Sequence, residues 1–102
     1  MSQGQQLPSA SSRAQDETKT PPLFKVLMHN DDYTTMEFVV EVLQAVFHQS
    51  DSAAERIMLA IHFQGLGLCG TYPFAIAETK VQEVRNMARK AGFPLRCSIE
   101  KE

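Results

Sequence analysis

The first regular pattern along the chain is an alternation of apolar and polar residues over Leu23–Asn30. Apolar side chains fall at every second position from Phe24 to Met28, and Lys25 and His29 occupy the other phase. A period of two is typical of a strand with one buried face. We therefore expect the first strand here.

Helical spacing follows in two stretches. The first begins with the capping-box pattern Thr34-x-x-Glu37 and runs to about Gln49, and the second begins with Ser52-x-x-Glu55 and ends at Gly65. Their apolar positions are Phe38, Val39, Val42, Leu43, Val46 and Phe47 in the first, and Ile57, Met58 and Ile61 in the second. These patterns predict two helices, of which the second is short.

The segment Leu66–Tyr72 is apolar but interrupted by Gly67 and Gly70, which favours a strand with a bulge or a close backbone approach. Pro73 suits the first turn of a third helix, and the helical apolar stripe that follows is closed by Gly92. A last strand is expected over Leu95–Glu100, where apolar and polar residues alternate again.

These elements predict an α+β domain over residues 23–102 with the order β-α-α-β-α-β. We expect a small three-stranded antiparallel sheet with three helices packed on one face. Residues 1–22 are rich in Ser, Gln, Thr, Ala and Pro and lack periodicity, which predicts a flexible N-terminal extension. Such an extension serves either as a solubilising leader or as an arm that a partner grips.

Composition narrows the function. The 102 residues are 43% hydrophobic, enough for one small core, and the net charge of −2 gives no general attraction for nucleic acid or anionic membrane. No apolar run approaches the ~20 residues that span a bilayer, and the first residues lack the pattern of a signal peptide. We expect a cytoplasmic monomer.

Neither cysteine suggests a metal site. Cys69 and Cys97 are far apart, form no Cys-x-x-Cys unit and have no histidine at ligand spacing. A disulfide between them is disfavoured inside a cell, and both lie in apolar runs. We expect both in the core, and we expect no metal or other cofactor.

A polar cluster, Asn30-Asp31-Asp32, stands where the first strand ends and the first helix begins. Such residues commonly satisfy free backbone N–H groups in turns and at helix starts. However, the pattern Thr34-x-x-Glu37 already supplies a helix cap. The cluster is therefore partly surplus to structure, which raises the expectation that at least one of its side chains faces a ligand.

Two apolar patches could accompany this cluster. Residues at positions i, i+3 and i+4 share one helix face, and the two sets are Met36, Val39 and Val40 in the first helix and Met58, Ile61 and His62 in the second. Core packing is the commoner explanation of such patches. A pocket with a polar rim is the alternative, because methionine adapts its shape and the histidine ring can titrate.

Catalysis is a rival use for Asp31, Asp32 and His62, which could act as base and orienting group. No activated nucleophile or glycine-rich phosphate loop accompanies them. We therefore expect that the protein is not an enzyme. A small hydrolase and a scaffold that binds a partner without reading chain ends remain the alternatives.

Several motifs in one order make a resemblance specific. They are Asn30-Asp31-Asp32-Tyr33-Thr34-x-Met36-Glu37-Phe38-Val39, Met58-Leu59-Ala60-Ile61-His62-x-Gln64-Gly65, Cys69-Gly70, Ala77-Glu78-Thr79-Lys80-Val81 and Pro94-Leu95-x-Cys97-x-Ile99-Glu100. Over about Pro22 to Glu102 the chain resembles the ClpS family, bacterial adaptors of the N-end rule that hand substrates to the ClpA unfoldase of the ClpAP protease.

The resemblance implies roles for individual residues. The residues that would bind the substrate's free α-amino group are Asn30, Asp31 and His62, and Asp32 and Thr34 would lie at the pocket edge. The residues that would form the hydrophobic pocket for a large N-terminal side chain (Leu, Phe, Tyr or Trp) are Met36, Val39, Met58, Ile61 and Leu95. Among them, Met36 would act as the gate against β-branched residues. The residues that would contact the ClpA N-terminal domain are Glu78, Thr79 and Lys80. The N-terminal extension matches the arm that the unfoldase engages.

The chain departs from the family pattern in two places. Thr35 stands where the family commonly has proline, and the segment Tyr72-Pro73-Phe74-Ala75 is less acidic than is usual before the third helix. The first change is expected to loosen the helix start, and the second to alter the contact with the unfoldase.

Overall fold

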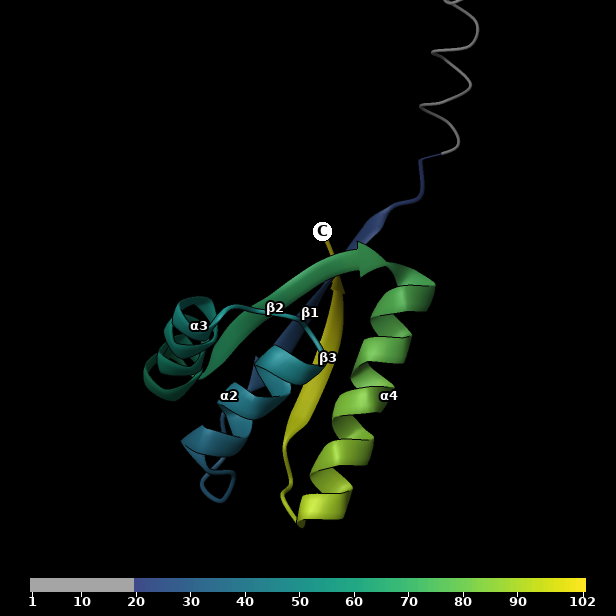
Figure 1. The fold of residues 1–102 in the computed structure, drawn as a ribbon. Coiled ribbons are helices and arrows are strands. Elements are labelled where there is room, and N and C mark those ends of the chain that lie inside the picture. The colour runs from purple at the N-terminus through teal and green to yellow at the C-terminus, as the bar shows by residue number, and fades with distance from the viewer. Residues whose placement is uncertain (1–19) are drawn as a thin grey trace, which may run out of the picture.

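The computed structural model describes residues 20–102, so residues 1–19 of the predicted N-terminal extension lie outside the described part. The described elements are β1 (Leu23–His29), α2 (Met36–Ala45), α3 (Asp51–Gln64), β2 (Leu66–Pro73), α4 (Phe74–Ala91) and β3 (Arg96–Lys101) (Figure 1). The predicted order β-α-α-β-α-β is confirmed.

The three strands form one antiparallel sheet in the order β2-β1-β3. Val26 in the central strand lies opposite Gly70 of β2, whereas the next residue, Leu27, lies opposite Leu68. Cys69 is thus an extra residue in β2, and the predicted bulge is confirmed.

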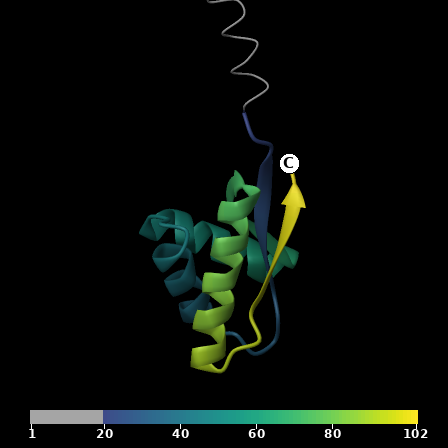
Figure 2. The ribbon, with the colours of Figure 1, turned by 90° about the vertical axis from the view of Figure 1, so that its right-hand side faces the viewer.

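The helices cover the sheet on one side, as predicted (Figures 1 and 2). Val26 and Met28 of β1 point toward them and are fully buried, while Lys25 and His29 in the other phase are only half-buried. The helices complete the core with buried residues, which are Phe38, Val39, Val42, Leu43, Ala54, Met58, Ile61, Ala77, Val84 and Ala88. One apolar face on each element is therefore enough to close this small domain.

Both cysteines belong to the core, as predicted. Cys69 is buried and Cys97 is half-buried against the core, and both are free thiols. A side-chain hydrogen bond with Cys97, burial and the electrostatic effect of Cys97 all raise the pKa of the Cys69 thiol. Cys69 therefore stays protonated and unreactive at neutral pH.

The start of α2 differs from the prediction. Thr35, not Thr34, is the N-cap, and its hydroxyl accepts a hydrogen bond from the Phe38 amide at 3.1 Å. Thr34 is unavailable as the cap because its hydroxyl donates to Asp31 at 2.7 Å. The two threonines are adjacent, so sequence spacing alone could not tell them apart.

The end of α2 comes at Ala45, earlier than the predicted Gln49. His48 adopts a positive φ of 56°, which a helix does not allow. The side-chain amide of Gln49 donates to the Cys69 carbonyl at 2.8 Å and so fixes this turn against β2. Val46 and Phe47 remain buried, so their apolar pattern continued after the helix had ended.

The start of α3 also differs. Its N-cap is Ser50, whose hydroxyl accepts from the Ala53 amide at 3.2 Å, rather than Ser52. With 14 residues it is longer than α2, which has 10, so the prediction of a short second helix is wrong. Gly65 closes it in the left-handed region, as its glycine predicted.

The ends of α4 are close to the prediction. Pro73 is the N-cap and also ends β2, so it stands just before the first turn rather than within it. Gly92 caps the C-terminus with a φ of 82°, a conformation that strains other residues. The last strand begins at Arg96, and Leu95 lies buried immediately before it.

Candidate functional site

A cavity of about 240 Å³ opens where the loop after β1 meets the starts and ends of two helices. Its lining consists of Asn30, Asp31, Asp32, Thr34, Met36, Val39, Met58, Ile61 and His62. These are nine of the ten residues predicted for the substrate pocket. The tenth, Leu95, lies elsewhere: it is buried and lines a separate cavity beside α4.

The cavity has an apolar floor and a polar rim. Val39, Met58 and Ile61 are no more than 7% exposed and form the floor. The side chains of Asn30, Asp32 and His62 stand at the solvent-exposed rim. A ligand that enters would therefore bury an apolar group below and keep a polar or charged group above.

Asp31 organises the rim. Its Oδ1 accepts hydrogen bonds from the backbone amides of Tyr33 at 2.8 Å and Thr34 at 2.7 Å, and its Oδ2 accepts from the Thr34 hydroxyl at 2.7 Å. Asp31 is therefore not surplus to structure, contrary to the argument from the helix cap. A carboxylate has about four lone-pair sites, so Asp31 can still accept from a ligand.

These hydrogen bonds shift the titration of Asp31. Burial alone raises its pKa, but the bonds from the Thr34 hydroxyl, the Thr34 amide and the Tyr33 amide together lower it more. The net pKa lies below the usual value of 3.8. Asp31 is consequently a fixed negative charge at the rim throughout the neutral and mildly acidic range.

The rim is held against α3 by the backbone. The amide of Asn30 donates to the Gly65 carbonyl at 2.9 Å, and the amide of Gly65 in turn donates to the Ile61 carbonyl at 3.0 Å. The left-handed conformation of Gly65, with a φ of 95°, directs the chain back toward β1. This link brings His62 and Asn30, which are far apart in the sequence, into one rim.

Two neighbours of the cavity were not predicted as site residues. Phe63 is 77% exposed, and its ring meets that of His62 edge to face at a centroid distance of 4.7 Å. Val40 lines an adjoining cavity of about 360 Å³, which shares Met36 and Met58 with the first. The helical spacing had placed Val40 beside Met36, whereas nothing in the sequence pointed to Phe63.

The residues predicted for the unfoldase lie on α4, outside this cavity. Glu78 and Thr79 are exposed. Lys80 is held within the fold, because its ammonium donates to the Val46 carbonyl at 2.7 Å and lies 5.6 Å from the Tyr72 ring centre. Lys80 therefore has a structural role at the end of α2, in addition to any role in binding the unfoldase.

The site offers hydrogen-bond acceptors and negative charge above an apolar floor. Within residues 20–102 no group of three or more His, Cys, Asp or Glu side chains is arranged to hold a metal ion. The same residues contain no helix that is long and apolar enough to cross a membrane. The arrangement suits a cationic donor group attached to an apolar one.

Comparison with known proteins identifies the family. A sequence model described as "ATP-dependent Clp protease adaptor protein ClpS" matches residues 19–98. An adaptor of this description from Shewanella loihica is 54% identical over 89 residues, which cover 87% of each chain. Another, from Desulfatibacillum aliphaticivorans, is 58% identical over 85 residues, or 83% of this chain and 82% of the relative. The chain belongs to the ClpS family of Clp protease adaptors, as the motifs predicted.

A solved structure agrees in fold and adds a ligand. It is the structure of Agrobacterium tumefaciens ClpS2 bound to L-phenylalaninamide, and it matches with a TM-score of 0.78 and 42% sequence identity. The match covers 81% of this chain and all of the other. L-phenylalaninamide carries a free α-amino group and a phenyl ring, so it combines a cationic donor with an apolar side chain.

Proposed function

We propose that this protein binds the N-terminal residue of its substrates by reading two features at once, a free α-amino group and a large apolar side chain. The observation that carries the proposal is the rim of Asn30, Asp31 and His62 above the apolar floor of the cavity. The α-amino group donates to the rim, and the side chain of Leu, Phe, Tyr or Trp enters the floor. Asp32 and Thr34 border the entrance.

The energetics require both features. An α-amino group has a reference pKa of about 7.7–8.0 and is mostly cationic at neutral pH. Burying one large apolar side chain contributes roughly 1.5–3 kcal/mol, whereas micromolar affinity needs about 8 kcal/mol. Charge-assisted hydrogen bonds of about 1.5–3 kcal/mol each supply much of the difference. An acetylated or internal residue lacks them and is rejected.

Met36 is proposed to act as the gate that disfavours β-branched side chains. It is 42% exposed at the mouth of the cavity and also lines the adjoining cavity with Met58. A branch at the substrate's Cβ would meet the Met36 side chain before the rest of the residue reached the floor. Unbranched Cβ atoms avoid this contact.

We further propose that the protein acts as an adaptor without catalysis of its own and delivers its substrates to the N-terminal domain of the ClpA unfoldase for degradation by ClpAP. The surface assigned to that contact contains Glu78, Thr79 and Lys80 on α4. Phe74 and Ile76, each 47% exposed, lie close to it in the first turn of the same helix. They would make the contact more apolar than the acidic pattern common in the family.

Fluorescence anisotropy with matched peptides tests the binding proposal. Two labelled peptides of identical sequence begin with Phe, and one of them is N-acetylated. We expect the free peptide to bind and the acetylated one to lose at least about 100-fold in affinity, the equivalent of roughly 2.7 kcal/mol. A third peptide with Gly first tests the apolar pocket. Equal binding of the acetylated peptide would instead support a scaffold that does not read chain ends.

A further inference from the structure

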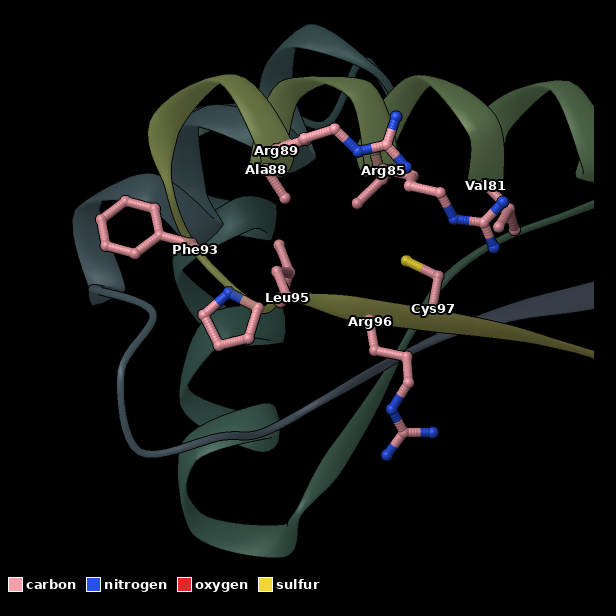
Figure 3. Close-up of a pocket in the computed structure, with 10 residues that line it drawn as sticks. Val81, Arg85, Ala88, Arg89, Phe93, Leu95, Arg96 and Cys97 are labelled. Carbon is pink, nitrogen blue, oxygen red and sulfur yellow. The ribbon is translucent and has the colours of Figure 1, made fainter.

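A separate cavity of about 350 Å³ lies between the C-terminal half of α4 and the start of β3 (Figure 3). It shares no lining residue with the substrate pocket. Val84, Ala88 and Leu95 give it an apolar interior, with exposures of 1%, 3% and 7%. Figure 2 shows α4 and β3 side by side along this side of the molecule. We name this feature the α4–β3 groove.

Positive charge borders the groove. Between residues 85 and 97 the sequence has four basic residues (Arg85, Arg89, Lys90 and Arg96) and no acidic one. Arg85 and Arg89 are exposed and line the groove from the helix, whereas the side chain of Arg96 points away from it (Figure 3). The rim is therefore cationic on the helix side.

These two arginines lack anionic partners in the described chain. Among residues 20–102, the Arg89 side chain makes no hydrogen bond or ion pair, and the Arg85 guanidinium donates only to the side-chain oxygen of Gln82, at 3.2 Å. Both guanidinium groups carry a positive charge and offer only hydrogen-bond donors. Like charges at positions i and i+4 of a helix repel by a few tenths of a kcal/mol.

The helix dipole explains the position of only one of these two arginines. Arg89 lies in the last turn of α4, where a positive charge is stabilised. Arg85 lies one turn earlier, where that effect has faded. An anion placed across both guanidinium groups would relieve their repulsion and accept paired hydrogen bonds.

We propose that the α4–β3 groove docks an acidic peptide segment of a protein partner. An apolar side chain of the segment enters between Ala88 and Leu95, and flanking carboxylates bind Arg85 and Arg89. Strand β3 pairs only with β1 among the described strands, so its other edge offers backbone groups to an extended peptide. A simple inorganic anion would leave the apolar interior empty.

Isotope-labelled protein tests the proposal by NMR. The probe is the peptide acetyl-Glu-Leu-Glu-Phe-Glu-amide, whose blocked end keeps it out of an α-amino site, and its matched control has Gln in place of each Glu. We expect the acidic peptide to shift backbone amides of residues 81–97, and the control to bind at least about tenfold more weakly. The single variants Arg85→Glu and Arg89→Glu should each weaken binding by a similar factor.

The control variant is Arg56→Glu, an equal charge change at an exposed position of α3 outside the groove. It should leave the affinity within about twofold, which separates a local contact from net charge. Circular dichroism checks that each variant is folded. The proposal is overturned if the Gln peptide binds as tightly, if the shifts fall on residues 30–34 and 58–62, or if inorganic phosphate reproduces them. Shifts that depend on protein concentration without peptide would also overturn it, because they would mean that a second copy fills the groove.

Discussion

At the scale of single residues, the rim of the substrate pocket separates two kinds of side chain. Asp31 accepts hydrogen bonds from its own loop, whereas within residues 20–102 the His62 side chain makes only a ring contact, with Phe63. His62 is therefore free to serve a ligand, and its loss should leave the fold unchanged. Asp31 combines both tasks, because removing it also releases Tyr33 and Thr34.

His62→Ala should weaken binding of a free Phe-initiated peptide by about 10- to 150-fold, because one charge-assisted hydrogen bond of about 1.5–3 kcal/mol is lost. Anisotropy measures the affinity. Gln64→Ala, at an exposed neighbouring position of α3 outside the cavity, is the matched control and should bind normally. An affinity unchanged by His62→Ala would remove the histidine from the rim's function.

Asp31 should titrate below pH 3.8, since its hydrogen bonds hold the pKa under that value. A lowered pKa in the folded state contributes stability that is present above the unfolded pKa and is lost as the pH falls through the folded pKa. The loop is therefore expected to stay ordered at mildly acidic pH and to loosen only in stronger acid. NMR titration of the Asp31 carboxyl carbon tests this, and a midpoint at or above 3.8 would contradict it.

The sequence predicted which residues meet at the site better than what each one does there. The polar turn and the two helix stripes supplied eight of the nine residues that line the cavity, because side-chain spacing is fixed by helix geometry, and the resemblance added Thr34. Leu95 was assigned by resemblance alone, and no pattern in this chain could show that it faces the α4–β3 groove. Nor could spacing show that Thr34 serves Asp31.

At the scale of elements, helix ends determine where the site residues stand. Helix α3 is capped by Ser50 and Gly65, and the Gly65 carbonyl accepts a hydrogen bond from the Asn30 amide. Periodicity predicted the type and order of all six elements, since each carries a clear apolar face. It could not fix the caps, because adjacent Ser and Thr residues satisfy the same rule and tertiary contacts decide between them.

Ser50→Ala should lower the free energy of unfolding by about 1 kcal/mol, the usual effect of losing an N-cap, because the Ala53 amide loses its acceptor. Urea denaturation measures this through the midpoint. Ser52→Ala is the control and should change stability by less than half as much, since among the described residues the Ser52 hydroxyl makes a hydrogen bond only with that of Ser50, at 3.4 Å. Equal losses in the two variants would mean that the cap is shared.

At the scale of the whole molecule, the net charge is small, but acidic and basic residues are concentrated in different parts of the sequence. Residues 31–55 contain six acidic residues and no Lys or Arg, whereas residues 85–97 contain four basic residues and no acidic one. The first range supplies five of the nine residues that line the substrate pocket, and the second supplies eight of the ten that line the α4–β3 groove. A cationic chain end and an acidic segment would thus be drawn to different parts of one surface.

The two sites should bind independently. The affinity for a free Phe-initiated peptide is expected to change by less than about twofold when the acidic acetylated peptide saturates the groove, because the two cavities share no lining residue. Anisotropy of the labelled Phe peptide measures this at several groove-peptide concentrations. A tenfold change, about 1.4 kcal/mol of coupling, would have to appear equally in the groove's affinity, because coupling between two binding sites is reciprocal. Such a result would mean that the hydrophobic core, to which Leu95 belongs, has two packing arrangements, and that each peptide binds one of them more tightly than the other.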